Sequence, residues 1–239
     1  MEIVATALLA VFTTGYLVLA GADIGVGMLL PWLGRSAPER RTVIAAFAPF
    51  FLGNEVWLVA VAGILAGAFP GMEHELLYAH RQLFLLLLLG WVVRDAGLWW
   101  RGRFDAAWWR AGCDTMVVAG SWALALALGG VLGSLLAGSA PYGLPIVAVF
   151  ALHGSGFARL RLPSSLRHRA VGSYPLTAVA LAGLALAAGA RLDLGHAVAG
   201  PSSLKIVTVF VLVMLPLMLG AQALSWWTFR ARVKGPGYL

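Results

Sequence analysis

The sequence predicts an all-α polytopic transmembrane bundle of about seven spans, with the N-terminus outside and the C-terminus in the cytoplasm. Of the 239 residues, 61% are hydrophobic and 11% are charged, with a mean hydropathy of +0.87. A soluble domain carries about 25% charged residues. Apolar stretches recur along the whole chain, and basic residues gather in alternate gaps between them. We expect residues 1–239 to form one integral membrane domain in contact with lipid.

Seven apolar runs are expected to form the spans, since about 20 such residues cross the hydrocarbon core as a helix. They cover residues 3–33, 42–69, 76–99, 112–137, 142–158, 171–190 and 204–229. The first run has no basic segment before it and is too long for the apolar core of a signal peptide, so we expect it to be retained as a span. Glycine and proline separate the later runs, as at Pro70-Gly71 and Gly200-Pro201.

Basic residues predict the orientation of these spans, because Lys and Arg in short loops stay on the cytoplasmic side. Fourteen are assigned to the gaps after the first, third and fifth spans and to the C-terminal tail: Arg35, Arg40, Arg41, Arg94, Arg101, Arg103, Arg110, Arg159, Arg161, Arg167, Arg169, Arg230, Arg232 and Lys234. The opposite side holds three, namely Arg81, Arg191 and Lys205. This distribution argues against a continuous nucleic-acid-binding face, so no nucleic-acid partner is expected.

No self-contained catalytic or metal-binding motif is visible. The single cysteine, Cys113, excludes an intramolecular disulfide and a cysteine-based metal cluster within this chain. The chain has no His-Glu-x-x-His sequence, no phosphate-binding loop and no Ser-His-Asp order. We therefore predict no catalytic residue and no metal ligand, and we look for function among polar groups inside the spans.

Two acids lie where the bilayer disfavours them. Asp23 is about ten residues from the cytoplasmic end of the first span, hence roughly 15 Å deep at 1.5 Å per residue. Glu55, counted from a helix entering near Thr42, lies about 20 Å deep. Asp23 is either part of a proton pathway or an ion site, or a neutral structural carboxyl hydrogen-bonded at a helix contact. Glu55 is either a proton-pathway residue or a protonated structural carboxyl bonded to Asn54 or a partner helix. Gly21, Gly25 and Gly27 leave room for close helix approach beside Asp23.

Five further polar or amphipathic side chains are structural candidates: Asn54, Trp57, Arg94, Asp114 and His153. Arg94 with Asp95, and Asp114 at the start of the fourth span, are predicted to form interfacial ion pairs that hold the third and fourth spans in register. His153 lies in the middle of the fifth span. It is either a haem ligand or, as is commoner for a lone histidine, a hydrogen-bonded core residue.

Two segments carry a resemblance to a known family. Residues 21–35 read GADIGVGMLLPWLGR and are followed by Glu39-Arg40-Arg41, and residues 49–70 read PFFLGNEVWLVAVAGILAGAFP. Together they resemble subunit II of cytochrome bd-type quinol oxidases. Arg94, Asp114 and Leu152-His153-Gly154 add collinear agreement. The match is strong over about the first 115 residues and loose afterwards.

The resemblance implies a function through a complex in the bacterial plasma membrane. Such a subunit pairs with a larger haem-bearing subunit I, with or without small accessory subunits. Haem b and haem d type cofactors and the quinol site belong to that partner, where dioxygen is reduced to water. This chain is then expected to bind no cofactor itself.

The chain departs from the family pattern in two ways. Family members have nine helices, so a helical hairpin before the last helix is missing here. The family pattern reads Trp-Asp-Gly-Asn before Glu/Gln-Val-Trp, whereas Phe51-Leu52 stand at the Trp-Asp positions, and Ala20 replaces another family acid. Asp23 and Glu55 are the acids that remain, so the resemblance leaves open whether protons pass through this subunit.

A bundle of seven spans with its N-terminus outside is also typical of two other classes of protein. A retinal protein needs a lysine deep in the last helix for its Schiff base, and Lys205 stands at the start of that helix. A transporter of small solutes or ions that uses Asp23 and Glu55 is the better alternative. It should act alone, whereas an oxidase subunit should copurify with a haem-bearing partner.

Overall fold

A computed structural model describes residues 1–195 and 198–235, and all regular elements within these ranges are helical. The elements are α1 (Glu2–Met28), α2 (Leu30–Leu33), α3 (Ala37–Phe47), α4 (Phe51–Ala68), α5 (Pro70–Ala79), α6 (Arg81–Trp100), α7 (Ala107–Ala137), the 3-10 helix η1 (Ala140–Gly143), α8 (Leu144–Arg161), α9 (Ser164–Arg167), α10 (Tyr174–Gly189) and α11 (Pro201–Thr228). Six segments are long and apolar enough to cross a membrane: α1, α4, α6, α7, η1 with α8, and α11. The predicted all-α, multi-pass class is therefore confirmed.

The helix within the expected span 171–190 is shorter than predicted. It is α10, with 16 residues between Tyr174 and Gly189. At 1.5 Å per residue it is about 24 Å long, less than the ~30 Å hydrocarbon core of a typical bilayer. Six helices, rather than seven, thus meet the length for a full span in the described part of the chain.

The expected continuous helix over residues 42–69 is wrong, because the chain breaks between α3 and α4. Residues 48–50 form a turn that contains Pro49, which has no backbone N–H to continue the helical ladder. Glu55 consequently lies in the second turn of α4. The depth of about 20 Å counted along one straight helix from Thr42 does not apply. Asp23 lies five residues before the end of α1 at Met28 and ten before the end of α2 at Leu33, the end of the expected first span.

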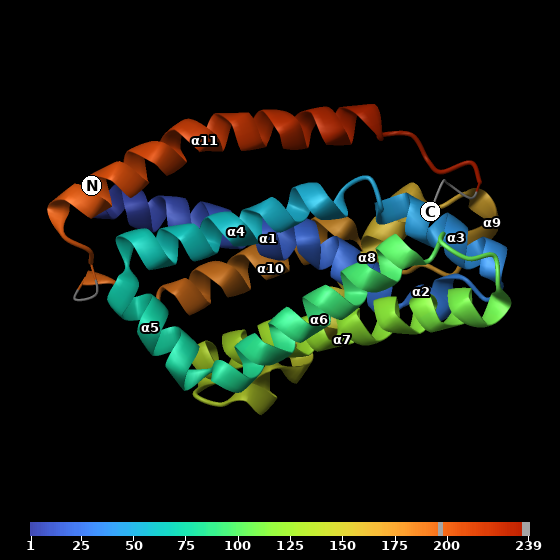
Figure 1. Cartoon of the computed structure of the whole chain (residues 1–239), viewed down its shortest axis with the longest axis horizontal. Coiled ribbons are helices and arrows are strands. Elements are labelled where there is room, and N and C mark those ends of the chain that lie inside the picture. The colour runs from blue at the N-terminus through green and yellow to red at the C-terminus, as the bar shows by residue number, and fades with distance from the viewer. Residues whose placement is uncertain (196–197, 236–239) are drawn as a thin grey trace.

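The connections that carry the basic residues lie at one end of the bundle. Figure 1 shows α2, α3, α9, the turn between α6 and α7 and the end of the described chain at one end, with the N-terminus and α5 at the other. This arrangement matches the alternation of basic and non-basic gaps in the sequence. Arg94 was misassigned to a gap, because it lies within α6 and is 2% exposed. The other assigned basic residues that lie within helices are Arg40, Arg41, Arg110, Arg159, Arg161 and Arg167.

Glycines let two helix pairs approach to backbone contact. A Cβ atom on Gly25 of α1 would lie 2.0 Å from the carbonyl oxygen of Phe150 in α8, and one on Gly154 would lie 2.1 Å from the carbonyl carbon of Gly25. Gly90 of α6 and Gly120 of α7 meet in the same way. Small residues at crossings are the usual means by which membrane helices associate. The close approach expected beside Asp23 is thus confirmed at Gly25.

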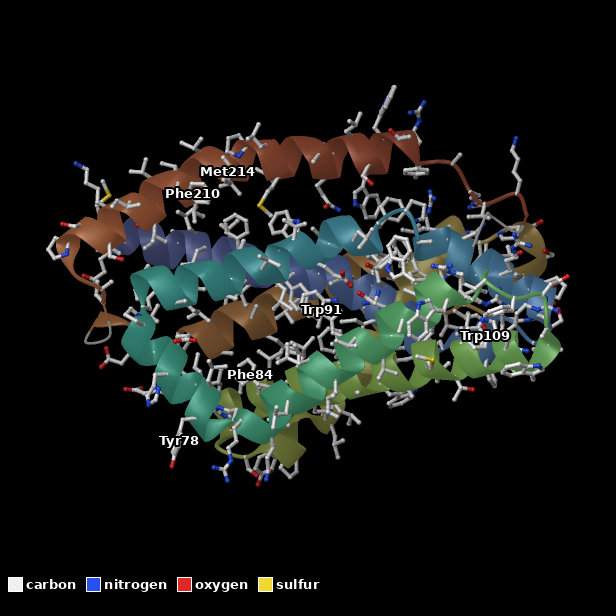
Figure 2. The ribbon with its side chains drawn as sticks, in the orientation of Figure 1. Tyr78, Phe84, Trp91, Trp109, Phe210 and Met214 are labelled. Atoms are coloured by element: carbon white, nitrogen blue, oxygen red, sulfur yellow. The ribbon has the colours of Figure 1, made fainter. Side chains whose placement is uncertain are left out.

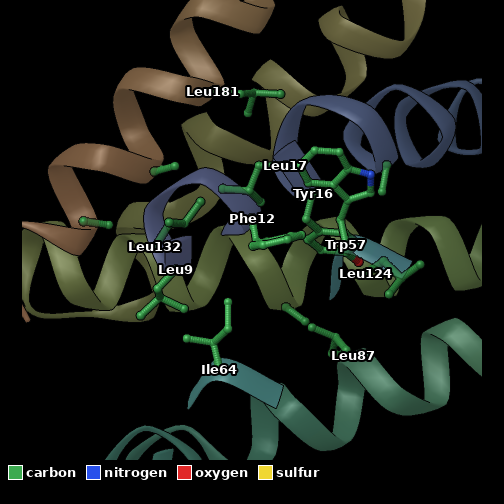
Figure 3. Packing of buried hydrophobic residues seen from close by; sticks show 14 of the residues in the cluster. Leu9, Phe12, Tyr16, Leu17, Trp57, Ile64, Leu87, Leu124, Leu132 and Leu181 are labelled. Carbon is green, nitrogen blue, oxygen red and sulfur yellow. The ribbon is translucent and has the colours of Figure 1, made fainter. Parts of the chain in front are cut away.

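The apolar core surrounds α1, as Figure 3 shows for Phe12, Tyr16 and Trp57. Trp57 of α4 is 5% exposed and its ring covers Gly15, where an added Cβ would lie 2.1 Å from a ring carbon. The ring also packs on Phe12, with 5.4 Å between ring centroids. Trp57 therefore holds α4 against α1.

An ion pair outside the spans fastens α3 to the chain before α10. Ser36 and Glu39 form a capping box at the start of α3, and the Glu39 carboxylate accepts two hydrogen bonds from Arg169, at 2.8 and 3.0 Å. The hydrogen bonds from Arg169, followed by that from the Arg35 backbone N–H, lower the pKa of Glu39 from 4.5 to about 2. The pair therefore stays ionised across physiological pH.

Candidate functional site

A buried polar cluster lies where α1, α4 and α6 meet. We define it by five residues: Asp23, Asn54, Glu55, Arg94 and Asp95. Four of them are buried, with exposed fractions between 1% for Asp23 and 8% for Glu55, and the side chain of Asp95 is 19% exposed. The cluster brings together residues from three helices that are distant in sequence.

Asn54 joins three helices through its side-chain amide. Its Nδ2 donates hydrogen bonds to Asp23 Oδ2 at 2.7 Å and to the Leu19 carbonyl at 3.1 Å, both on α1. Its Oδ1 accepts a hydrogen bond from Gln222 Nε2 of α11 at 2.9 Å. Asn54 therefore bonds Asp23 and not its neighbour Glu55.

Glu55 faces α6 instead of α1. Its Oε1 lies 3.4 Å from Arg94 Nη1, and the same Nη1 lies 3.9 Å from Asp95 Oδ1. The Glu55 and Asp95 carboxyl groups also lie within hydrogen-bonding reach of one another and of the Trp91 side chain. Figure 2 shows Trp91 near the middle of the bundle, on α6 beside α4. A hydrogen bond between two carboxyl groups requires a proton on one of them.

Several buried polar atoms of the cluster lack a protein partner. Asp23 Oδ1 and the Nε and Nη2 atoms of Arg94 have no hydrogen-bond partner among the residues that the structure describes. Arg94 also interacts electrostatically with Asp23, Glu55 and the buried Tyr16 hydroxyl. Buried polar atoms of this kind call for water or a further protein group.

The charges of the cluster suit it to hold protons. Three carboxyl groups surround one guanidinium, so ionisation of all three would leave uncompensated negative charge in a membrane-spanning bundle. Such a charge is costly in a medium of low dielectric constant. Protonation of the carboxyl groups reduces this negative charge. One such proton can lie between an oxygen of Glu55 and an oxygen of Asp95. The arrangement can therefore take up and release protons as a coupled group.

Asp114 forms an ion pair that joins the third and fourth spans, as predicted, whereas Arg94 does not. Asp114 lies within α7, which begins at Ala107, and does not open the helix. Its carboxylate binds Arg101 at 2.6 Å and Arg40 at 3.2 Å, linking α7 to the ends of α6 and α3. The predicted contact of Arg94 with Asp95 lies within α6 itself, and the closer partner of Arg94 is Glu55. Arg94 thus joins α6 to α4 rather than to α7.

His153 is hydrogen-bonded through both ring nitrogens. Nε2 donates to the Val18 carbonyl at 2.8 Å and Nδ1 accepts from the Thr177 hydroxyl at 2.8 Å, a pattern that suits a neutral imidazole. The ring stacks on Tyr174, with 4.6 Å between centroids, and is fully buried. Neither nitrogen is open to iron, so His153 does not fit a haem. In the described ranges, no group of three or more His, Cys, Asp or Glu side chains is placed to hold a metal ion.

Sequence reasoning missed three members or neighbours of the cluster: Asp95 as a partner of Glu55, Gln222 and Tyr16. Asp95 lies in an apolar run, and an acid in such a run indicates a functional residue. Because it follows Arg94 directly in the sequence, only an ion pair with Arg94 was predicted. Gln222 is an uncharged polar residue six residues before the end of α11, and its partner lies 168 residues away. Only the packing of the helices shows these contacts.

Comparison with known proteins matches most of the chain. Residues 1–194 match the family described as cytochrome bd terminal oxidase subunit II. Subunit 2 of the cytochrome bd-I ubiquinol oxidase of Escherichia coli K12 is 34% identical over 131 residues, which cover 55% of this chain and 35% of that protein. A probable cytochrome oxidase subunit 2 of Haemophilus influenzae matches to the same extent. The chain thus spans about a third of the length of these two relatives.

A second kind of relative aligns along nearly the whole chain. Subunit 2 of the cytochrome bd ubiquinol oxidase of Bacillus subtilis is 26% identical over 320 aligned positions, which cover 95% of each protein. Because 320 positions exceed the 239 residues of this chain, the alignment includes stretches that this chain lacks. That result agrees with the expected loss of a helical hairpin. With a family match over residues 1–194 and a multi-pass helical fold, the chain belongs to the family of cytochrome bd terminal oxidase subunit II.

Proposed function

We propose that this chain is the second subunit of a quinol oxidase in the bacterial plasma membrane, which oxidises quinol and reduces dioxygen to water. The family match over residues 1–194 is the observation that carries the proposal. Haem b and haem d type cofactors belong in a larger subunit I, which also holds the quinol site. The engagement of both His153 nitrogens supports this division, because this buried histidine is not available to iron.

The face formed by α4, α6 and α11 is proposed to pack against subunit I. These are the spans with the smallest buried fractions: 33% for α4, 28% for α6 and 17% for α11. Large apolar side chains such as Val59, Val92 and Leu217 are each about 60% exposed or more on them. The polar cluster lies beneath this face, so groups of subunit I or ordered water can reach its unpaired atoms. Lipid, or small accessory subunits, cover the remaining surface.

The polar cluster is proposed to be a proton station of the complex. Leu52 occupies the position of the family acid, and Glu55 with Asp95 supplies a carboxyl pair near that position. Asp23 lies on the other side of Asn54, so a proton passing between Glu55 and Asp23 must use water or a partner group. Transfer between oxygens requires about 3 Å, and ordered waters supply such steps. This role assigns Glu55, Asp95 and Asp23 to proton handling and no residue of this chain to oxygen chemistry.

Copurification tests the proposed function. Isolation of the tagged chain from its native membrane in mild detergent is expected to yield a larger partner and the absorption bands of b and d type haems. Haem-staining after separation of the subunits should label the partner and not this chain. A stable preparation of this chain alone that transports a solute would contradict the proposal and support the transporter alternative.

Orientation is tested by labelling of single cysteines in intact cells. The proposed N-outside topology places Gly102, in the turn after α6, in the cytoplasm and Tyr78 of α5 outside; both are exposed. A membrane-impermeant maleimide is expected to label the Tyr78→Cys variant and not the Gly102→Cys variant. The unmodified chain is the control, since its one cysteine, Cys113, is buried. The reverse labelling pattern would overturn the topology.

A further inference from the structure

A groove lined by basic residues opens at the end of the bundle that carries α2 and α9. Two adjoining hollows, of about 570 and 530 Å³, share His168 and Val171 as walls. The first runs between Trp32, after α1, and Leu152 of α8. The second is lined by Arg159 and Arg167. None of its lining residues belongs to the polar cluster, so the two sites are separate.

Hydrogen bonds fix the walls of this groove. The Val171 backbone N–H donates to Ser155 Oγ at 2.8 Å, which holds the segment after α9 against α8. Trp32 Nε1 donates to the Arg169 carbonyl at 3.3 Å, and Arg169 donates to the Leu33 carbonyl at 3.0 Å. The segment is therefore tied both to α8 and to the end of α1. The shape of the groove is therefore fixed by these hydrogen bonds.

The charge in the groove is positive. Arg169 is neutralised by Glu39. Arg35, Arg159 and Arg167 form no ion pair with a carboxylate in the described part of the chain, and Arg35 lies over the Trp32 ring at 5.9 Å. His168 is exposed between them. These side chains can donate hydrogen bonds to a phosphate from several directions.

The remainder of the groove is apolar and continues toward the membrane. Leu29, Ala151 and Leu152 line its inner wall. Beyond it, α10 packs on α8 and presents Leu176 and Val179 outward, each 71% exposed. The basic part of the groove complements the charged headgroup of a phospholipid, and the adjoining apolar helix face complements its acyl chains.

We propose that this groove binds an anionic glycerophospholipid. The phosphate lies among Arg35, Arg159, Arg167 and His168, and the acyl chains extend along Leu152 and α10. The lipid bridges the end of α1, α8 and the segment before α10. It thereby stabilises the short helix α10, whose 16 residues do not reach across the hydrocarbon core by themselves.

Native mass spectrometry of the detergent-purified complex tests the site with phosphatidylglycerol as the probe and phosphatidylcholine as the neutral comparison. The complex is expected to retain phosphatidylglycerol. The double variant Arg159→Gln/Arg167→Gln is expected to bind it about 25-fold more weakly, since each basic residue near a membrane surface contributes about fivefold. The matched control is Arg103→Gln/Arg232→Gln, which removes two exposed basic residues at the same end but outside the groove. Equal binding by the two double variants would overturn the proposal.

A photoactivatable phosphatidylglycerol provides a second test on the unmodified complex, so the result does not depend on how the variants fold. Crosslinks are expected within residues 29–35 and 151–179. Crosslinks only elsewhere would overturn the site, as would a partner-subunit segment crosslinked across these residues in place of lipid. Competition distinguishes the source of the phosphate: inorganic phosphate in large excess should leave the crosslinks in place. Their loss would show a site for free anions and refute the lipid proposal.

Discussion

Replacing Glu55 by glutamine is expected to slow quinol-driven oxygen consumption by about tenfold or more, within the range that positioned acid–base groups contribute. Glutamine keeps the shape of the side chain and can still contact Arg94, but it cannot bind and release a proton. The absorption spectrum of the haems should not change, because the substitution leaves the partner subunit intact. Oxygen consumption by the purified complex, with the spectrum recorded on the same sample, measures both effects.

Matched variants separate a proton role from a structural one. Asp95→Asn is expected to slow turnover as well, because the Glu55 and Asp95 carboxyl groups lie on the same Arg94 guanidinium nitrogen. Asp105→Asn, at a carboxylate that is 99% exposed, is the control and should be silent. Adding Leu52→Asp to the Glu55→Gln chain restores the acid of the family pattern and should recover part of the rate. Full activity in Glu55→Gln alone would assign proton delivery to the partner subunit.

Replacing Gly154 by alanine is expected to prevent assembly of a stable complex. The new methyl group would meet the backbone of Gly25 at 2.1 to 2.4 Å, and neither backbone can move without separating α1 from α8. Overpacking of this kind costs typically about 1 to 3 kcal/mol, and the cost is greatest where rigid backbone atoms are involved. The yield of haem-bearing complex and its thermal midpoint in detergent measure the effect.

Gly183→Ala supplies the control for this prediction. Gly183 lies on α10 with nothing within 4 Å of an added Cβ, so alanine should be neutral or slightly stabilising there because of its higher helix propensity. A Gly154→Ala complex as stable as the Gly183→Ala complex would show that the α1–α8 contact is looser than described.

The class of fold could be predicted from the sequence because it depends on local quantities. The lengths of the apolar runs and the alternation of basic gaps can be read from the sequence alone. Only helices and closed barrels can span a bilayer, so few folds are compatible with this pattern. The boundaries were less predictable. The break at Pro49 falls inside an apolar run, where prolines are also tolerated in continuous membrane helices, so nothing in the local pattern distinguished a kink from an end.

The site was predictable only as a set of separate residues. Burying an acidic side chain in the membrane costs free energy whichever way the side chain points. Asp23 and Glu55 could therefore be identified without any knowledge of helix packing. Their partners depend on how each helix is rotated about its axis. Asn54 and Glu55 are adjacent in sequence, yet one faces α1 and the other faces α6. The depths expected for Asp23 and Glu55 therefore gave no information on which groups each carboxyl contacts.

The hydrogen bond between Asn54 and Gln222 has a consequence for the biogenesis of the protein. Gln222 is synthesised 168 residues after Asn54. While the ribosome is still extending the chain, α1, α4 and α6 can already enter the membrane. At that stage the side-chain oxygen of Asn54, Oδ1, has no hydrogen bond from Gln222. An unsatisfied amide in hydrocarbon is unfavourable, so insertion of α11 closes the bundle by satisfying it. Synthesis of α11 thereby becomes a condition for pairing the Asn54 side chain.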